Sequence, residues 1–474
     1  MKKYIAFIAI VIGLSSCWDD INDVKPADSL EVSDFYSSLE DFNASLGGAM
    51  QQLQNYYALE LLIMGDIPTD NVIQVTSGRF SSDVYWDWRY SSLNDIGLLD
   101  EGYEAVNIAN SIIANIDALP DGNEKDNIRG QAIAVRALAH FDMVRVYGRI
   151  PTESASAGAS LGLPYLRFED GDTGNPFAQP ARETVDSNYG EIVADLLAAR
   201  DLVNATSVEN RFTVEAINGL LSRVYLYMGQ YQNAIDAADL VASAPADADV
   251  LLSVFQDASN DGILMKLAVD FGSGDALSPG VVWSQSSATA TVSEYAIAYD
   301  FYTSLAADDT RDSTYVFLGT NQGSNYNAIR KWLGEGNQVN GTKDMPVIRV
   351  EEVILNKAEA QFELSQAGAE ATLNELRDVR YGAYAGGETG AALESAIRFE
   401  RRIELFAEYS RWFDLRRWGL GVNRGNFGDV ADGTGTVPEN LTLAPGADEF
   451  LLPIPLTEIQ ANPNFEQNPG YASE

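Results

Sequence analysis

Cysteine and histidine, the two residue types most often used for covalent, acid–base and metal chemistry, each occur once in this chain, as Cys17 and His140. Cys17 follows Leu14, Ser15 and Ser16. An aliphatic residue, two small residues and a cysteine form a bacterial lipoprotein box, in which the thiol receives a diacylglycerol and the freed amine a third acyl chain. We therefore predict that Cys17 is lipidated. The alternative is an unpaired cysteine in an ordinary signal peptide.

The residues before Cys17 have the three parts of a secretory signal. Lys2 and Lys3 are followed by an apolar run at 4–13 and then by small residues. The apolar run is shorter than the roughly 20 residues needed to span a bilayer. We predict a signal peptide at 1–16 that is removed, and an acidic flexible tether at 17–30. Several acyl chains, at ~0.8 kcal/mol per buried methylene, would then anchor the protein to the membrane.

His140 lies in the helical run AIAVRALAHFDMVRVYG, among apolar neighbours. Catalytic triads and zinc sites need histidine or cysteine in company, so we interpret His140 as a packing residue and expect no enzyme. A pair of carboxylates could hydrolyse a glycoside without histidine. The 69 acidic residues neither indicate nor exclude such a pair.

Two acidic stretches carry oxygen ligands of the kind that calcium prefers. They are Asp308-Asp309-Thr310-Arg311-Asp312 and the group of Asp66, Asp70 and Asn71. Neither has a complete ligand spacing, so we interpret both as solvated turns. We predict no cofactor and no metal site, with calcium left as an open alternative.

Two loop regions have a composition suited to carbohydrate binding, because flat aromatic rings stack on the C–H faces of sugars and nearby polar groups bond to the hydroxyls. If the segment around 85–90 is extended, alternate residues lie on one side. The predicted glycan-binding residues are Arg79, Trp86, Trp88, Tyr90, Asn94, Trp283, Tyr295, Tyr326 and Trp332. The alternative is that aromatic residues of these loops pack against the helices, and we expect this of at least half of the first group.

The chain is strongly acidic, with 31 Lys and Arg against 69 Asp and Glu and a net charge of −38 at pH 7. Removal of Lys2 and Lys3 with the signal makes it more negative. Such a surface disfavours nucleic acid, whose binding depends on Lys and Arg. It also disfavours polyanionic glycans, so we predict a neutral carbohydrate ligand. The acidity could equally serve solubility in a salty habitat.

Apolar periodicity indicates the scaffold that positions these loops. The spacing of Ile217, Leu220, Leu221, Val224 and Met228 predicts a helix, which Gly229 ends before a second helix at 231–242. This hairpin resembles a tetratricopeptide repeat. Similar pairs are predicted at 102–118 with 127–147, at 185–203 leading into 217–242, and at 348–364 with 369–380.

Four stretches between the helices are rich in Gly, Asn, Asp, Ser and Pro, which is typical of loops. They are residues 66–100, 149–183, 244–346 and 420–474. We predict a mostly α fold, with a helical-hairpin scaffold, long irregular loops and few short strands. It would form a single domain at 31–474 with a loop-rich insertion at about 244–346.

The C-terminal region carries the most specific motifs. Residues 397–419 read IRFERRIELFAEYSRWFDLRRWG, which we interpret as a charged helix with Arg401 and Glu404 close enough to pair. Three further motifs accompany it: LLPIPLTEIQANPNFEQNPGY at 451–471, PVIRVEEVILNKAEA at 346–360, and LNELRDVRYGA after residue 360. Together these motifs closely resemble those of the SusD/RagB family of outer-membrane glycan-binding lipoproteins.

The resemblance implies a cell-surface lipoprotein of the outer membrane that captures oligosaccharides and delivers them to a SusC-like TonB-dependent porin, without chemistry. It also implies that the hallmark residues form a structural ion-pair and packing cluster. These residues are Arg401, Arg402, Glu404, Glu408, Arg411, Trp412, Asp414 and Arg416. The alternatives are a helical-repeat scaffold that binds a protein or peptide, and a surface glycosidase.

Overall fold

The computed structural model describes residues 35–75, 79–93, 97–168, 174–175, 178–269, 277–286, 291–321, 324–334, 341–425 and 435–472. The predicted signal peptide and tether, with Cys17, and the predicted site residue Asn94 lie outside the described residues. The α-helices are α3 (Leu39–Ala58), α4 (Glu60–Asp66), α5 (Asp83–Trp86), α6 (Leu98–Asn115), α7 (Asn123–Tyr147), α8 (Val185–Arg200), α9 (Val214–Tyr227), α10 (Tyr231–Ala238), α11 (Leu251–Phe255), α12 (Tyr299–Tyr302), α13 (Thr310–Tyr315), α14 (Val350–Glu363), α15 (Ala369–Arg377), α16 (Ala391–Glu404), α17 (Arg411–Arg417) and α18 (Leu456–Ala461). The 3₁₀ helices are η1 (Ile116–Ala118), η2 (Pro151–Glu153), η3 (Ala157–Ala159), η4 (Pro279–Val282) and η6 (Asp448–Phe450).

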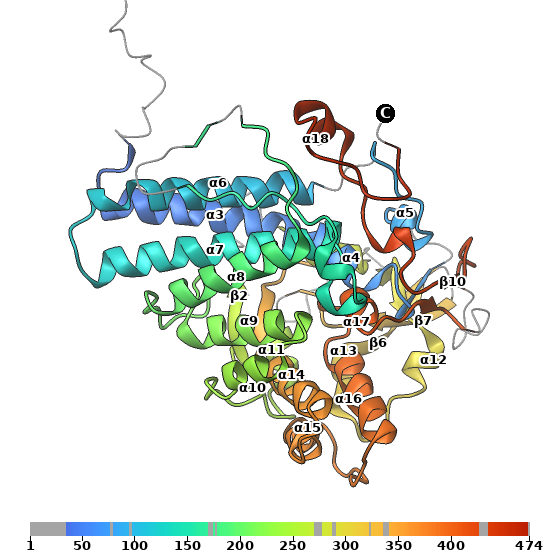
Figure 1. The fold of residues 1–474 in the computed structure, drawn as a ribbon. Helices are drawn as coiled ribbons and strands as arrows, with labels where there is room; N and C mark the ends of the chain where they lie inside the picture. The colour runs from blue at the N-terminus through green and yellow to red at the C-terminus, as the bar shows by residue number, and fades with distance from the viewer. Residues whose placement is uncertain are drawn as a thin grey trace, which may run out of the picture.

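The long helices form a ladder in which each packs against the next (Figure 1). Helix α3 contacts α6 and α7, and contacts then continue through α8, α9, α10, α14 and α15. Helix α7 lies inside this ladder, and nearly every residue from Ile128 to Tyr147 is buried. The prediction of a mostly helical fold built from paired helices is therefore confirmed. Within the described residues, no helix is both long enough and apolar enough to cross a membrane.

The hairpin of α9 and α10 could be predicted from the sequence because residues within the hairpin itself determine it. Thr213 caps α9 by accepting a hydrogen bond from the backbone N–H of Ala216, at 3.0 Å. Gly229 has a φ of +68°, a conformation that glycine adopts without steric cost, and it ends the first helix. The apolar positions predicted from the spacing, including Ile217, Leu220 and Leu221, are fully buried.

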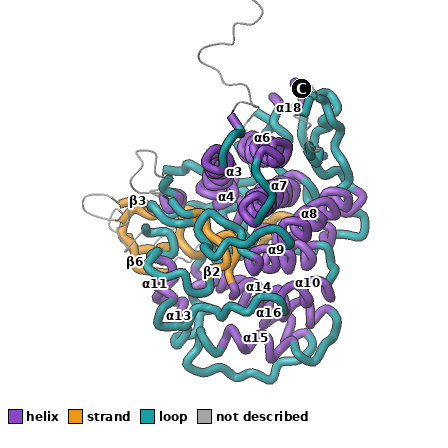
Figure 2. The backbone as a smooth tube through the Cα atoms, turned by 90° about the vertical axis from the view of Figure 1, so that its left-hand side faces the viewer, coloured by secondary structure: helices purple, strands orange, loops and turns teal. Residues whose placement is uncertain are grey.

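The strands are short; several lie on the side of the molecule away from α8 and α10, and others lie near the centre beside α9 (Figure 2). They are β1 (Val72–Gln74), β2 (Ile263–Leu267), β3 (Ser284–Ser286), β4 (Thr291–Ser293), β5 (Tyr295–Ile297), β6 (Val316–Asn321), β7 (Ser324–Ile329), β8 (Met345–Arg349), β9 (Val422–Asn423) and β10 (Thr442–Leu443). An antiparallel sheet has the order β1-β5-β7-β6, and three strand pairs join β2 with β8, β3 with β4, and β9 with β10.

The prediction of one helix across 397–419 is wrong. Helix α16 ends at Glu404, and α17 begins at Arg411. Between them Ala407 and Tyr409 have φ values of 60° and 64°, outside the helical range. A Cβ on Gly65 of α4 would lie 2.6 Å from the Cα of Tyr409, so the interruption lets this backbone approach α4 closely.

Candidate functional site

A pocket of about 770 Å³ lies where α3, α4, α5, α6 and η4 meet, a size in the range of ligand sites. Its polar lining residues are Asn55, Glu60, Arg79, Ser81, Ser82, Tyr85, Glu101 and Ser278. Its apolar lining residues are Ala58, Leu59, Ile63, Leu277, Val281 and Val282. The pocket thus combines apolar surface with hydroxyl, amide and carboxylate groups, which suits an uncharged ligand rich in hydroxyl groups.

One wall of the pocket is the segment 79–85, and Arg79 fixes its start. The backbone N–H of Arg79 donates to both oxygens of Glu294, at 2.9 and 2.8 Å, and its Nε donates to Oε1 at 2.6 Å. Its Nη2 also donates to the carbonyl of Val281, at 3.2 Å. Because the buried Glu294 carboxylate already balances the guanidinium charge, Arg79 contributes shape and donors to the wall more than net positive charge.

Two carboxyl groups also line the pocket. Glu60 is almost fully buried at the start of α4, and Glu101 lies in the first turn of α6. A Cβ built on Gly97 would lie 3.6 Å from Oε1 of Glu60 and 4.0 Å from Cδ of Glu101, so both carboxyl groups lie close to Gly97. The lining thus contains two carboxyl groups and one guanidinium group, which is paired with Glu294.

Tyr85 supplies the aromatic ring of the lining. It lies on α5, three residues after Ser82, so one turn of helix places both side chains on the pocket side. Its ring is half-buried and packs on Tyr90, with ring centroids 5.7 Å apart. The extended conformation considered for 85–90 is not found, because Asp83–Trp86 is helical and Trp88 has a φ of 54°.

Most of the aromatic residues predicted to bind sugar are core residues instead. Trp86, Trp283 and Tyr295 are fully buried, and Tyr295 packs against both indole rings with centroids 6.0 and 6.5 Å apart. Trp88 donates from Nε1 to the carbonyl of Pro68 at 2.9 Å. Such rings have no face left for a sugar. The remaining buried rings of the predicted set are Tyr326 and Trp332.

The structure brings only part of the predicted set to the pocket. Arg79 lines it, and Tyr90 supports Tyr85 from behind. Tyr85, Glu60 and Glu101 also line the pocket, and none of them is among the residues predicted from the sequence. The spacing of Ser82 and Tyr85 was a usable signal if the segment had been interpreted as a helix. No local signal marked the two glutamates, because their helices meet only in the fold.

His140 is a packing residue, as predicted. It is buried, and its ring stacks on Tyr165 with centroids 3.9 Å apart. Its Nε2 accepts a hydrogen bond from the backbone N–H of Leu166 at 3.3 Å. Burial lowers the pKa of His140 to about 3, so the imidazole is neutral at physiological pH.

The interpretation of the two acidic stretches as solvated turns is wrong for Asp66 and Asp309, which are buried, whereas Asp308 is exposed in a turn as predicted. Asp309 is buried and bonds to Arg311, with Oδ2 2.8 Å from Nη2. Asp70 accepts two hydrogen bonds from Arg411, both at 2.8 Å, and Asp66 accepts one from Asn71 at 2.6 Å. These oxygens are thus engaged with protein donors, whereas Oδ2 of Asp66 is buried without a hydrogen-bond partner among the described residues. Across the described ranges, no cluster of three or more His, Cys, Asp or Glu could hold a metal ion.

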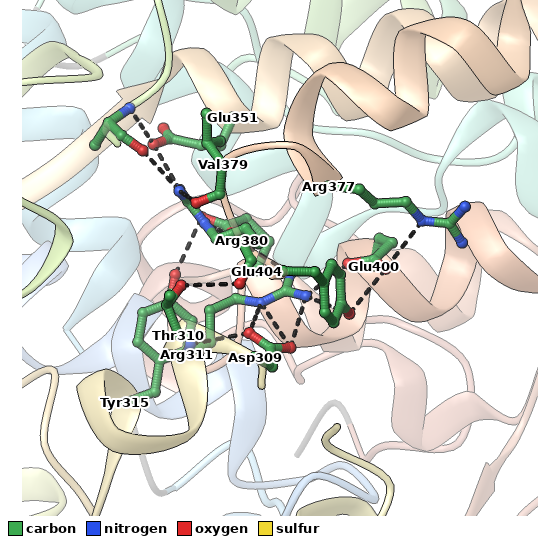
Figure 3. Close-up of polar contacts among 12 residues, drawn as sticks. Asp309, Thr310, Arg311, Tyr315, Glu351, Arg377, Val379, Arg380, Glu400 and Glu404 are labelled. Atoms are coloured by element: carbon green, nitrogen blue, oxygen red, sulfur yellow. Dashed lines mark hydrogen bonds and ion pairs between the residues drawn. The ribbon is translucent and has the colours of Figure 1, made fainter. Parts of the chain in front are cut away.

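Glu404, one of the hallmark residues near the C-terminus, lies in a buried network of ion pairs with Arg311 and Arg380 (Figure 3). The Glu404 carboxylate accepts hydrogen bonds from Arg380 at 2.9 Å, from Arg349 at 3.1 Å and from Arg311 at 3.3 Å. Burial alone would raise the pKa of Glu404, but these guanidinium groups outweigh it and hold the pKa well below its ordinary value. The network joins α13, β8 and α16, which are far apart in sequence.

Arg401 does not pair with Glu404, contrary to the prediction from their spacing. Its Nε donates to both oxygens of Asp414 at 2.9 Å, and its Nη1 donates to Asn356 at 2.6 Å. This pair ties α16 to α17 across the interruption. Trp412 beside it is fully buried. Arg402 and Arg411 bond to the loop at 70–71, and Arg416 donates to the carbonyl of Gly148 at 2.6 Å.

Comparison with known families and proteins gives consistent matches along the chain. A model described as SusD family matches residues 308–471, and one described as starch-binding associating with outer membrane matches residues 23–226. The SusD-like protein P2 of Formosa agariphila is 27% identical, with 99% of this chain and 100% of that protein covered. A SusD-like protein of Bacteroides ovatus is 24% identical, with 88% and 83% covered.

Solved structures show the same fold. A protein from Bacteroides vulgatus described as sugar binding superposes with a TM-score of 0.80 at 26% identity, covering 92% of this chain and 100% of that chain. A SusD superfamily protein from Bacteroides thetaiotaomicron has a TM-score of 0.80 at 25% identity, covering 91% of this chain and 100% of that chain.

Proposed function

The chain belongs to the SusD family, and from that premise we propose that it is a cell-surface lipoprotein that captures glycans in the pocket beside α5. The observation that carries the proposal is the pocket itself, which is large enough for several sugar units and offers a tyrosine ring, serine hydroxyls and carboxylates on one surface. The sugar-binding description of the Bacteroides vulgatus neighbour supports the ligand class.

The ligand we propose is neutral. The lining holds Glu60 and Glu101, and the guanidinium of Arg79 is matched by Glu294. A uronate or sulfate entering this space would meet like charge in a partly desolvated site, where repulsion is strong. The net charge of −38 acts in the same direction at longer range.

The proposed role ends with delivery of the glycan to a SusC-like TonB-dependent porin of the outer membrane, with the protein tethered through a lipid on Cys17. The lipoprotein box and the description of the matched family as associating with the outer membrane support this location. The buried ion-pair network gives the scaffold a rigid body, which suits a protein that must present a preformed site to a partner.

A panel of neutral hexaoses (malto-, cello-, laminari- and mannohexaose) tests the proposal by isothermal titration calorimetry. We expect heat of binding with at least one of them and its loss in Tyr85→Ala. Absence of binding to every hexaose and to the parent polysaccharides would reject glycan capture and favour a scaffold for a protein or peptide. Release of reducing sugar would favour a glycosidase.

The charge preference has a separate test. With a uronate-containing oligosaccharide such as hexagalacturonate, we expect negligible binding by the wild type and measurable binding by the double variant Glu60→Gln, Glu101→Gln. Ser81→Ala serves as the matched control in the same lining, since it removes a polar group without changing charge. Tighter binding of hexagalacturonate than of the neutral hexaoses by the wild type would reject a neutral ligand.

A further inference from the structure

The guanidinium of Arg424 lies between two tryptophan rings behind the wall of the pocket. Its Cζ is 3.9 Å from the ring centroid of Trp86 and 4.2 Å from that of Trp88. Arg424 is almost fully buried, and it follows β9 in the C-terminal part of the chain. A planar cation held between two indole faces gains cation–π attraction from both, and only arginine among the cationic side chains has this shape.

The same guanidinium bonds to three carbonyl groups from three separate segments. Nη2 donates to the carbonyl of Trp86 at 2.6 Å, Nε to that of Thr69 at 3.2 Å, and Nη1 to that of Asn440 at 3.2 Å. Trp86 is the last residue of α5, so the first bond satisfies a carbonyl at the end of that short helix. Arg424 therefore ties α5 to the loop before β1 and to the strand region near β10.

These contacts hold Trp86, which is adjacent in the chain to the lining residue Tyr85. The wall segment has two fixed points, the Arg79–Glu294 pair at its start and Arg424 at Trp86. Ser81, Ser82 and Tyr85 lie between the two. A four-residue helix cannot hold its own position, because isolated helices of this length are unstable in water. Its orientation depends on what its ends are attached to.

A second contact from the C-terminal part supports the same arrangement. The backbone N–H of Glu439 donates to Oδ1 of Asp87 at 2.8 Å, and the N–H of Thr436 donates to the carbonyl of Gln74 at 2.8 Å. In Figure 1 the segment carrying α5 and the C-terminal segment carrying β10 lie on the same side of the molecule. Residues 436–439 thus also contact strand β1 and the segment that follows α5.

We propose that Arg424 is a positioning residue for glycan binding, which sets the place of Ser82 and Tyr85 by clamping Trp86 and Trp88 from behind. The inference rests on the proposed function, because it assigns the pocket as the glycan site. Arg424 itself is not among the lining residues. Its effect on affinity is therefore indirect, and it follows from the geometry of α5.

Two substitutions of Arg424 in the full chain test this role, with affinity measured for the tightest-binding hexaose of the neutral panel. In Arg424→Ala we expect affinity to fall about tenfold or more, since a preformed site loses affinity when its groups must be ordered on binding. Arg424→Lys should fall similarly, because an ammonium group cannot lie flat between the rings and reach three carbonyls. Tryptophan emission should also change in both variants, because the guanidinium group no longer contacts the indole rings of Trp86 and Trp88.

Chemical rescue distinguishes positioning from general stability. Guanidinium at non-denaturing concentration should restore both the affinity and the emission of Arg424→Ala, and ammonium should not. The matched control is Arg182→Ala. Arg182 is also a buried arginine that bonds to carbonyls, but its hydrogen bonds go to Gly162, Leu161, Tyr147, Glu466 and Asn468, all outside α5 and the segment at 79–88. We expect that variant to lose stability while keeping its affinity.

The outcomes separate the two proposals. Wild-type affinity in Arg424→Ala, with Tyr85→Ala inactive in binding, would overturn the positioning role and leave the proposed function standing. Equal loss of affinity in Arg182→Ala, with no rescue by guanidinium, would show that only stability is involved and would also overturn it. If the wild type binds no hexaose, the proposed function fails and the positioning role fails with it.

Discussion

Glu294 accepts hydrogen bonds from both the backbone N–H and the side-chain Nε of Arg79, while its own carboxylate is 1% exposed. Glu294 directly precedes β5, so this contact attaches the pocket wall to the four-stranded sheet. It also means that the guanidinium group of Arg79 is paired with a carboxylate of the protein itself. The neutral character that we propose for the ligand depends on this pairing.

Replacing Glu294 with glutamine should loosen the wall. The amide of Glu294→Gln has one oxygen in place of two and no charge, so it cannot accept all three bonds. We expect hexaose affinity to fall and the free energy of unfolding to drop by about 1–3 kcal/mol, the usual cost of an unsatisfied buried partner. Calorimetry and urea unfolding measure the two effects. Glu439→Gln is the control, since that carboxylate is exposed and lies 3.8 Å from Arg89.

Tyr85 and Trp283 should respond in opposite ways to truncation. Tyr85→Ala removes the aromatic ring of the lining, so we expect weaker hexaose binding at nearly unchanged stability. Trp283→Ala removes a fully buried ring and should cost about 3–5 kcal/mol of stability. Parallel titrations and thermal melts check this. Loss of affinity at full stability in Trp283→Ala would restore the ring to the sugar-stacking role predicted from the sequence.

Glu404 should govern stability in acid. In the folded state the Glu404 carboxylate has a pKa well below its ordinary value of 4.5, so its stabilising contribution is complete above that value and is lost as the pH falls through the folded pKa. We expect Glu404→Gln to be destabilised by about 3–5 kcal/mol at pH 7, because three buried arginines lose their shared partner. The difference from wild type should shrink on acidification below 4.5.

Urea unfolding at a series of pH values measures the effect of Glu404→Gln. The control is Glu394→Gln, which breaks a partly exposed pair with Arg398 one helical turn away and should cost less than about 1 kcal/mol. A Glu404→Gln variant as stable as wild type at pH 7 would contradict the importance of the network.

Asp66 should have the opposite dependence on pH. Burial raises its pKa from 3.8 to about 7, so the folded state holds this proton more tightly than the unfolded state. Its contribution to stability is greatest below pH 3.8 and falls as the pH rises to about 7. We expect Asp66→Asn, which imitates the protonated acid, to gain stability relative to wild type between pH 5 and pH 8. A constant difference across that range would contradict the assignment.

Cys17 should be the only site of acylation. In cells given labelled palmitate, we expect label in the wild-type protein and none in Cys17→Ala, which should leave the outer-membrane fraction. Tyr85→Ala serves as the control, because it changes the pocket and leaves the lipoprotein box intact. Retention of Cys17→Ala in the outer membrane would show that another feature provides the anchor.

Helices that depend on local spacing could be predicted from the sequence. The apolar positions at Ile217, Leu220 and Leu221 repeat with the helical period, and Gly229 supplies the turn, so neighbours in the chain were enough to define the hairpin of α9 and α10. The family was likewise evident from motifs that are contiguous in the chain. The break between α16 and α17 was not, because it exists to bring Tyr409 against Gly65 of a distant helix.

The composition of the loops indicated carbohydrate binding, but it could not tell a stacking platform from a core. Both uses call for large aromatic side chains, and which one holds for Trp86 is decided by Arg424, 338 residues away, and by Tyr295. The sequence by itself determined the helical scaffold, the acidic charge and the lipoprotein box, since these follow from local order and composition. Only the tertiary structure decided which rings are covered and which side chains share a pocket, because burial is set by neighbours that are distant in the chain.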